Sequence, residues 1–311
     1  MVDISIIIPT YNRLWCLPQA VDSCRHSKFI TEIIVVDDGS DDGTSDWLKS
    51  QHDLKVISRQ RWGKCRAVNE AFHNATGKYI RFLDSDDLLD ITANDEQFAI
   101  AQHTNADLVV SGYKVFTDEQ TILKTQPWVA CDDFIAQQLG ECDASHYSAY
   151  LFKKQFIRDI PHRPEFSFRD DRLFVLEVAL KDPVISLHRG TALLHRSHRR
   201  GRLQENSGLK QEVQNYQHLL IYKHILHRLG AEQRLTGRRI DASLKILWPL
   251  CNWIAQTHLQ DAEKVYEWIT LLKPDFEVSA KGLSGFLFRN TGFSFTQKLL
   301  RIIRFIKYGW R

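Results

Sequence analysis

The chain has 311 residues, and its composition of 43% hydrophobic and 25% charged residues excludes a globally disordered protein. Its formal net charge of +3 is too small to indicate a nucleic-acid partner. The six cysteines show no CxxC spacing, which favours reduced thiols in a cytosolic protein over a disulfide framework.

The N-terminal residues, MVDISIIIPTYNR, have neither a positively charged region before the apolar run nor a small-residue cleavage site, so they do not read as a signal peptide. No apolar stretch approaches the ~18 residues that a membrane-spanning helix needs. We therefore expect a cytoplasmic protein without a transmembrane helix.

Strands and helices are predicted to alternate over the first part of the chain. Apolar, β-branched runs predict strands at residues 4–8, within 31–40, at 54–58 and at 78–83. Helices are expected between them, at residues 17–27, 43–51 and 63–75. Thr44 or Ser45 is the expected N-cap of the second helix, and Gly77 is expected to close the third.

This alternation predicts a doubly wound α/β sheet, in which ligands bind beyond the carboxyl ends of the strands. Three polar segments follow strands in this way, and we expect them to face one crevice: PTYN, DDGS and DSDD. Later strands are predicted within 107–113, 148–152, 184–187 and 191–195, with a helix at 169–181. From about residue 209 the pattern is helical, so a domain boundary is placed between 200 and 215.

The segment RFLDSDDLLD places four carboxylates within residues 84–90, directly after a predicted strand. Like charges at this spacing repel and raise one another's pKa, which indicates a positive partner. Carboxylates two positions apart, as in Asp84–Ser85–Asp86, suit a hard divalent cation. The alternative is a solvated acidic loop before a helix, and we interpret Asp87 and Asp90 as such helix N-terminal charges.

Five segments together resemble the family 2 glycosyltransferases, the inverting, nucleotide-sugar-using group with the GT-A fold: SIIIPTYNR, EIIVVDDGSDDGT, GKCRAVNEAF, GKYIRFLDSDD and FRDDRLF. The resemblance implies an α/β fold with a GT-A type, Rossmann-like mixed sheet flanked by helices, followed by a smaller, mainly helical C-terminal region. We place the catalytic domain at residues 1–210, with a nucleotide-sugar half at about 1–110 and an acceptor half at about 111–210. The helical region is residues 211–311, which the resemblance does not cover.

The resemblance also implies a donor site. Asp86 would ligate Mg²⁺ or Mn²⁺, while Asp84 and Ser85 would lie against the ribose or the metal shell. Asp38 would accept the N3–H of uracil or thymine, although an acid in an ordinary turn is the alternative. Five further residues are assigned to the donor: Pro9, Thr10 and Tyr11 to base and ribose, Arg13 to phosphate, and Lys64 to the diphosphate. For each of the two basic residues, a solvated surface charge is the alternative.

By the same resemblance Asp171 is the catalytic base. The family usually has Glu-Asp where this chain has Asp170–Asp171, which leaves the role of Asp170 open. The alternative for both is that they complement a helix dipole. The basic segment HRSHRRGR makes His198 a candidate metal ligand or diphosphate contact, or part of an exposed loop.

We therefore predict an inverting, metal-dependent glycosyltransferase of the hexosyltransferase class. It would move a sugar from a nucleotide-diphosphate sugar, UDP- or dTDP-linked, to a hydroxyl of a glycan or lipid-linked acceptor in bacterial surface polysaccharide synthesis. The alternatives are a catalytically silent nucleotide- or sugar-binding scaffold and a glycoside hydrolase, which would need neither the metal nor a nucleobase site. The identity of the sugar, the acceptor and the oligomeric state stay open.

The tail TQKLLRIIRFIKYGWR, residues 296–311, predicts a basic amphipathic helix, and the sequence has no acid from Val278 onward. Such a helix can lie in the interface of an anionic membrane. The alternative is that its apolar face packs on the catalytic domain or on a second subunit.

Overall fold

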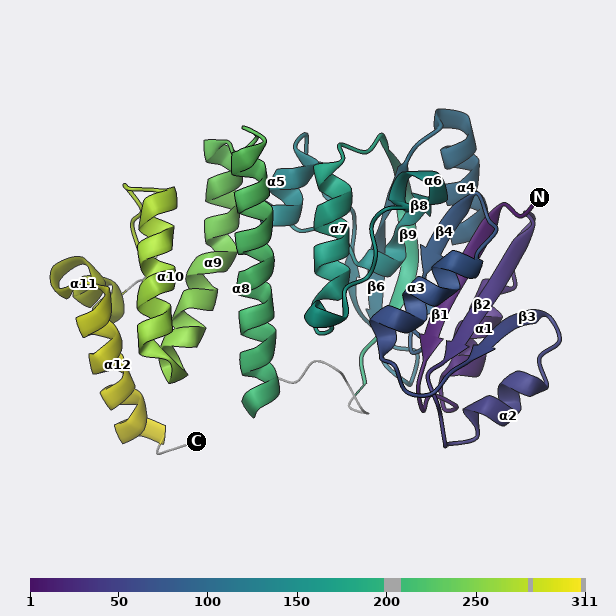
Figure 1. Cartoon of the computed structure of the whole chain (residues 1–311), viewed down its shortest axis with the longest axis horizontal. Coiled ribbons are helices and arrows are strands. Elements are labelled where there is room, and N and C mark those ends of the chain that lie inside the picture. The colour runs from purple at the N-terminus through teal and green to yellow at the C-terminus, as the bar shows by residue number, and fades with distance from the viewer. Residues whose placement is uncertain (199–207, 279–281, 309–311) are drawn as a thin grey trace. The chain divides into compact units, whose positions relative to one another are not determined.

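A mixed β-sheet forms the centre of the first part of the chain. The computed structural model describes residues 1–198, 208–278 and 282–308 (Figure 1). Within these residues the sheet has the strand order β3-β2-β1-β4-β8-β6-β9-β5, with β7 beside β6. Its strands are β1 (Ile4–Thr10), β2 (Thr31–Asp37), β3 (Leu54–Ser58), β4 (Tyr79–Phe82), β5 (Leu88–Leu89), β6 (Leu108–Phe116), β7 (Ile122–Gln126), β8 (Leu151–Lys153) and β9 (Ile185–Arg196).

The first four strands are parallel, with β1 between β2 and β4. β8 is antiparallel to both β4 and β6, which makes the sheet mixed. Long apolar side chains fill β1 and β2 because both faces of these strands are buried. The predicted architecture is confirmed: a mixed sheet flanked by helices, followed by a helical C-terminal region.

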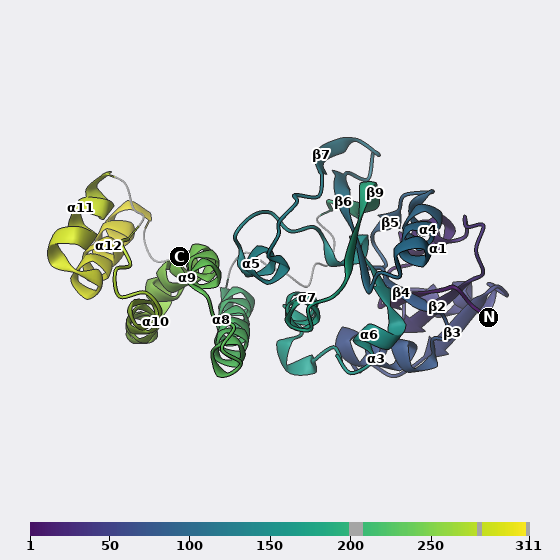
Figure 2. The ribbon, with the colours of Figure 1, turned by 90° about the horizontal axis from the view of Figure 1, so that it is seen from above.

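Helices cover both faces of the sheet (Figure 2). One face carries α1 (Leu17–Cys24) and α4 (Ala93–Thr104); the other carries α3 (Lys64–Asn74), α6 (Lys154–Ile157) and α7 (Asp170–Leu180). Because side chains alternate along β4, Arg81 meets Asn94 of α4 while Phe82 packs edge-to-face on Phe174 of α7.

The chain divides into two compact units, Met1–Phe134 with Cys142–Leu203, and Ile135–Glu141 with Gln204–Arg311. The domain boundary expected at residue 210 stays a prediction. Most of α5 (Phe134–Leu139) groups with the second unit, an assignment that local sequence patterns did not indicate. The other helices of that unit are α8 (Gly208–Ala231), α9 (Gly237–Thr257), α10 (Leu259–Leu272), α11 (Gly282–Thr291) and α12 (Phe293–Tyr308).

Two local predictions were wrong. The N-cap of α2 (Thr44–Lys49) is Gly43, which adopts a left-handed φ of 92°, and Asp42 Oδ1 accepts the N–H of Thr44 at 3.0 Å. Helix α3 ends with Ala75 in an extended conformation, so Gly77 is not its closing residue. Gly77 instead packs against β1, and its N–H donates to Ser5 Oγ at 2.8 Å.

We expect Gly77→Ala to destabilise the protein by about 1–3 kcal/mol, because overpacking of a dense interior costs about that much. A Cβ at this position would lie 2.4 Å from the backbone nitrogen of Ser5, too close for any contact. Thermal unfolding of the full chain would measure the change. Gly230→Ala in α8 is the control, since a Cβ there meets nothing within 4 Å, and an equal loss in both variants would contradict the prediction.

Candidate active site

The end of β1 presents a buried hydroxyl to the predicted crevice. Thr10 is 3% exposed, and its Oγ1 has no hydrogen-bond partner among the described residues. Pro9, also in β1, is buried beside β2, where it pairs in register with Val36. The guanidinium of Arg61 lies 4.4 Å from the centre of the Tyr11 ring, so that ring is already held on one side. A buried hydroxyl normally has a hydrogen-bond partner, so either a ligand or a water molecule at this position would complete the bonding of Thr10.

The end of β2 holds the loop that leads into α3. Asp38 is buried, and its carboxylate accepts the N–H groups of Trp62 at 2.6 Å and Gly63 at 2.8 Å. Each of these oxygens keeps a further lone pair, because a carboxylate offers about four acceptor sites. Asp38 can therefore both position this loop and accept one donor from a base.

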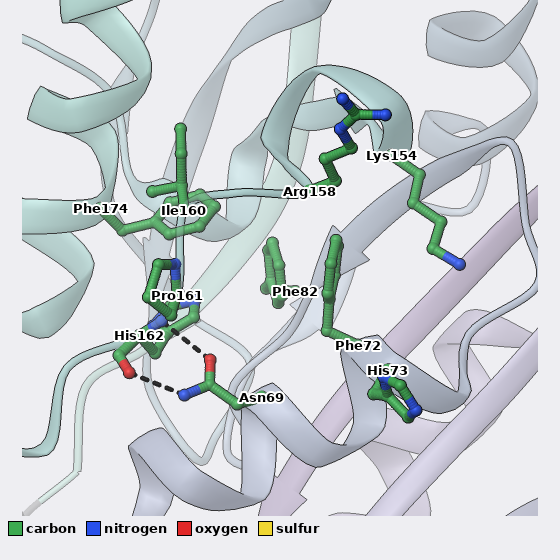
Figure 3. A pocket seen from close by; sticks show the side chains of 10 residues that line it. All are labelled: Asn69, Phe72, His73, Phe82, Lys154, Arg158, Ile160, Pro161, His162 and Phe174. Atoms are coloured by element: carbon green, nitrogen blue, oxygen red, sulfur yellow. Dashed lines mark hydrogen bonds between the residues drawn. The ribbon is translucent and has the colours of Figure 1, made fainter.

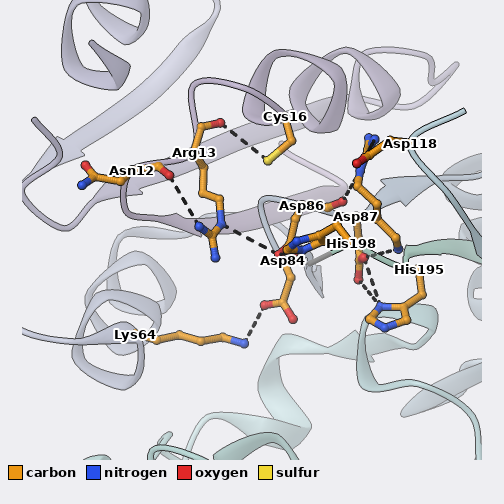
Figure 4. A network of polar contacts seen from close by, with 11 residues as sticks. Asn12, Arg13, Cys16, Lys64, Asp84, Asp86, Asp87, Asp118, His195 and His198 are labelled. Atoms are coloured by element: carbon orange, nitrogen blue, oxygen red, sulfur yellow. Dashed lines mark hydrogen bonds and ion pairs between the residues drawn. The ribbon is translucent and has the colours of Figure 1, made fainter. Parts of the chain in front are cut away.

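The Asp84–Ser85–Asp86 motif follows β4, and its first carboxylate has a cationic partner (Figure 4). Lys64 Nζ lies 2.6 Å from Asp84 Oδ1, and Ser85 is buried beside them. Burial lowers the pKa of the Lys64 ammonium, but the charges of Asp84 and of the two acids that begin α7 outweigh burial and raise it. For Asp84 burial raises the pKa, whereas Lys64 lowers it to a net downward shift.

The second carboxylate of the motif meets two more of the predicted residues. Asp86 Oδ2 lies 3.0 Å from His198 Nε2 and 3.8 Å from Arg13 Nε. Trp15 packs edge-on against the His198 ring at 5.1 Å between centroids. Residues far apart in the sequence thus surround the Asp86 carboxylate (Figure 4). Their basic groups are the positive partners that the acidic cluster after β4 led us to expect.

Asp87 forms a second acidic centre that the sequence did not predict. It is 1% exposed, and it accepts the backbone N–H of Arg196 at 2.8 Å and contacts His195 Nδ1 at 3.1 Å. The expectation that Asp87 acts as a helix N-terminal charge was therefore wrong. His146 stacks on His195 at 4.9 Å, and ligand atoms of these three residues lie within 4.8 Å of one another, as a metal site would require. His195 belongs to the basic segment noted above, whereas no local pattern marked His146.

The N-terminus of α7 carries the two acids of the FRDDRLF motif in different environments. Asp171 is half-buried, and its Oδ1 accepts the backbone N–H of Arg172 at 2.7 Å. Its charge is among those that raise the pKa of Lys64 and that oppose the lowering of the pKa of His146, so Asp171 lies within electrostatic range of both. Asp170 is buried and bonds His162 Nδ1 at 2.8 Å.

His162 continues that contact to Tyr147, whose hydroxyl lies 2.8 Å from Nε2. Three buried polar groups thus satisfy one another beneath the site. This series of hydrogen bonds indicates that Asp170 supports the site rather than facing an acceptor.

We expect Asp170→Asn to lower the melting temperature at pH 7 and to lose that effect in acid. Burial raises the pKa of Asp170, but the His162 hydrogen bond and the Lys64 charge lower it to a net downward shift. A carboxylate with a lowered pKa stabilises the folded protein above its unfolded-state pKa of about 3.9, and this stabilisation disappears as the pH falls. The loss at pH 7 should be about 1–3 kcal/mol.

Melting curves of parent and variant between pH 7 and pH 3 would test this. Asp159→Asn is the control, because that carboxylate is exposed on the surface. A difference between parent and Asp170→Asn that does not shrink with falling pH would contradict the assigned ionic role.

A separate pocket of 420 Å³ opens among α3, α6 and α7 (Figure 3). Its described lining includes none of the predicted donor or metal residues. Two hydrogen bonds connect Asn69 and His162, which both line the pocket. Asn69 Nδ2 donates to His162 O at 2.7 Å, and His162 N donates to Asn69 Oδ1 at 2.8 Å. We place the chemistry at the acidic motif rather than here, because the charged groups gather there.

Comparison with known proteins identifies the family of this domain. Residues 5–158 match the model of the family described as Glycosyl transferase family 2. The chain carries a family 2 glycosyltransferase domain. This domain is 42% identical over 91 residues to an uncharacterized glycosyltransferase of Rickettsia conorii, an alignment that covers 27% of this chain and 15% of that protein.

EpsJ of Bacillus subtilis, an uncharacterized glycosyltransferase, is 27% identical over 180 residues, which cover 55% of this chain and 52% of EpsJ. The chain thus spans about half or less of the length of these curated relatives. The structure also resembles that of S. aureus TarS 1-349 in complex with UDP-GlcNAc, with a TM-score of 0.55. That likeness covers 88% of this chain and 91% of the TarS chain, and at 16% identity it supports the GT-A-like fold alone.

Proposed function

We propose that this family 2 glycosyltransferase is an inverting, metal-dependent enzyme that uses a UDP- or dTDP-linked sugar. The observation that carries the proposal is that Lys64 pairs with Asp84 while Arg13 and His198 meet Asp86. A diphosphate bound at this site would bring its own negative charge to two basic side chains, while a cation neutralised the acids. The UDP-GlcNAc bound in the structurally similar TarS supports a uridine donor.

The potential metal-ligating atoms at Asp86 and His198 fit a divalent cation. Adjacent ligand atoms around an ion with bonds of ~2.1 Å lie about 3 Å apart, and Asp86 Oδ2 lies 3.0 Å from His198 Nε2. A carboxylate with an imidazole suits Mn²⁺ better than Mg²⁺, which prefers oxygen ligands alone. When bound, such an ion supplies stabilisation of the charge that develops on the leaving diphosphate.

The residues of the chain divide the remaining work. Asp38 accepts the N3–H of the base, and Thr10 Oγ1 with Tyr11 contacts base or ribose. Lys64 and Arg13 hold the phosphates. Asp171 takes the proton of an acceptor hydroxyl while the hydroxyl oxygen attacks C1 of the donor sugar. The attack comes from the face opposite the leaving nucleoside diphosphate, so the configuration at C1 inverts.

We further propose that the acceptor is a glycan or a lipid-linked sugar in bacterial surface polysaccharide synthesis, and that the protein acts in the cytoplasm at the inner face of the cell membrane. Named bacterial glycosyltransferases among its relatives support this assignment. Within residues 1–198, 208–278 and 282–308, no helix combines the length and the hydropathy of a membrane-spanning segment.

A panel of nucleotide sugars, each incubated with Mn²⁺, with Mg²⁺ or with a chelator, tests the proposal. We expect release of UDP or dTDP from one donor, only with a divalent ion present, and a product of inverted anomeric configuration. Binding without turnover on any donor would instead favour a silent nucleotide-binding scaffold.

A further inference from the structure

The last helix, α12, buries two polar residues beside Phe293 on one side and exposes apolar side chains on the other. Thr296 and Gln297 are fully buried, and Gln297 Nε2 donates to Asn252 Oδ1 at 2.6 Å. Phe293 anchors the same inner side by stacking on Tyr266 with 4.5 Å between ring centroids. The inner side of α12 is therefore occupied by contacts with α9 and α10.

The opposite side of α12 carries an apolar strip, which we call the outward strip: Phe295, Leu299, Ile302 and Ile306. Their spacing of four, three and four residues places them on one side of a helix. Phe295 is 58% exposed, Ile302 56% and Ile306 77%, so the described part of the chain leaves this strip largely in water. An apolar strip of this length exposed to water indicates a surface that binds something else.

The positive charge around the outward strip indicates which kind of partner the strip binds. From Val278 to the C-terminus the sequence has seven basic residues and no acid. Lys298 and Arg301 are both exposed beside the strip. A second copy of the chain would bring this positive charge against itself, whereas an anionic lipid surface would be complementary to it.

A pocket of 510 Å³ beside α12 contains Lys298 and Arg301, but Asp261 and Glu263 also line it. Its charges therefore balance, and it offers no excess of positive charge to a single phosphate. We therefore assign the attraction for anionic lipid to the basic surface of α12 as a whole and not to a pocket that binds one headgroup.

We infer that α12 lies in the interface of an anionic membrane, with the outward strip among the acyl chains and Lys298 and Arg301 at the headgroups. Long basic side chains can extend to headgroups in this way while their stems stay apolar. This inference does not depend on the donor or the acceptor of the enzyme, because it rests on the surface of α12 alone.

Flotation of the full chain with vesicles tests the inference. We expect binding to mixed vesicles of phosphatidylcholine and phosphatidylglycerol, and at least about tenfold weaker binding by the double variant Ile302→Ser, Ile306→Ser. The matched control is Ile122→Ser with Leu123→Ser, an apolar pair on β7 that is 47% and 58% exposed, and this variant should bind as the parent does. Equal binding by parent and the α12 variant would overturn the inference.

The charge is tested separately with Lys298→Gln, Arg301→Gln. This variant should bind mixed vesicles about tenfold more weakly and phosphatidylcholine vesicles as the parent does. Melting temperatures equal to the parent's would show that both variants fold. If the parent fails to bind mixed vesicles but forms a dimer that the Ile302→Ser, Ile306→Ser variant cannot form, the strip is an interface between copies and the inference is wrong.

Discussion

Asp171→Asn is expected to abolish sugar transfer while leaving the affinity for UDP nearly unchanged. The amide keeps the shape of the carboxylate at the start of α7 but cannot accept the proton of an acceptor hydroxyl. Loss of a general base typically costs about 10²–10⁴-fold in rate. Nucleotide binding should persist, since the contacts proposed for the donor come from β1, β2 and the acidic motif after β4. Turnover assays with the donor found in the panel, together with calorimetry for UDP, measure the two effects.

The neighbouring acid provides the sharpest comparison. Asp170→Asn should reduce activity only through stability, because Asp170 is buried against His162. The exposed Asp159→Asn should match the parent in both assays. Activity of Asp171→Asn within about tenfold of the parent would remove Asp171 as the base, and an inactive but stable Asp170→Asn would move that role to Asp170.

Asp86→Ala is the second large effect that we expect. It should remove activity and lower the affinity for UDP in the presence of Mn²⁺ by at least about tenfold, because even outer partners of a metal change affinity 10–100-fold. Affinity for UDP measured with a chelator should change much less. Calorimetry with and without Mn²⁺ separates the two contributions.

The cluster of Asp87, His146 and His195 is a rival metal site, so Asp87→Ala is the natural comparison. If Mn²⁺ binds through Asp86 and His198, Asp86→Ala should lose the metal-dependent affinity, whereas Asp87→Ala and His146→Ala should keep it. The reverse result would place the ion at the rival cluster. Unchanged affinity in all three variants would mean that these residues hold no ion.

The sequence predicted the first four strands and the helices between them because each has a strong local signal. β-Branched runs formed β1 and β2, and the predicted helix at 63–75 became α3. Predictions that depended on packing were less accurate. Residues 184–187 and 191–195 seemed separate strands across Gly190, yet pairing with β6 joins them as β9 with a shift in register.

Asp87 shows why part of the site was missed. Its place directly before β5 and α4 made it look like one more helix charge in an acidic run. Its actual role depends on β9, more than a hundred residues later, which brings Arg196 N and His195 to it. A local sequence pattern cannot predict the contacts of Asp87 with Arg196 and His195, because these contacts form only when β5 and β9 lie side by side.

The sequence by itself determined the fold class, the family of the domain and the acidic motif, since strand periodicity and short motifs at strand ends are local properties. Tertiary structure decided which charges pair: Lys64 with Asp84, Arg13 and His198 with Asp86, and the buried His162 with Asp170. It also decided that α12 buries Thr296 and Gln297 and exposes several apolar side chains, which the sequence could not show because either side of an amphipathic helix can be turned inward. The physical reason is the same in each case: burial and ion pairing are set by elements distant in the chain that packing brings into contact.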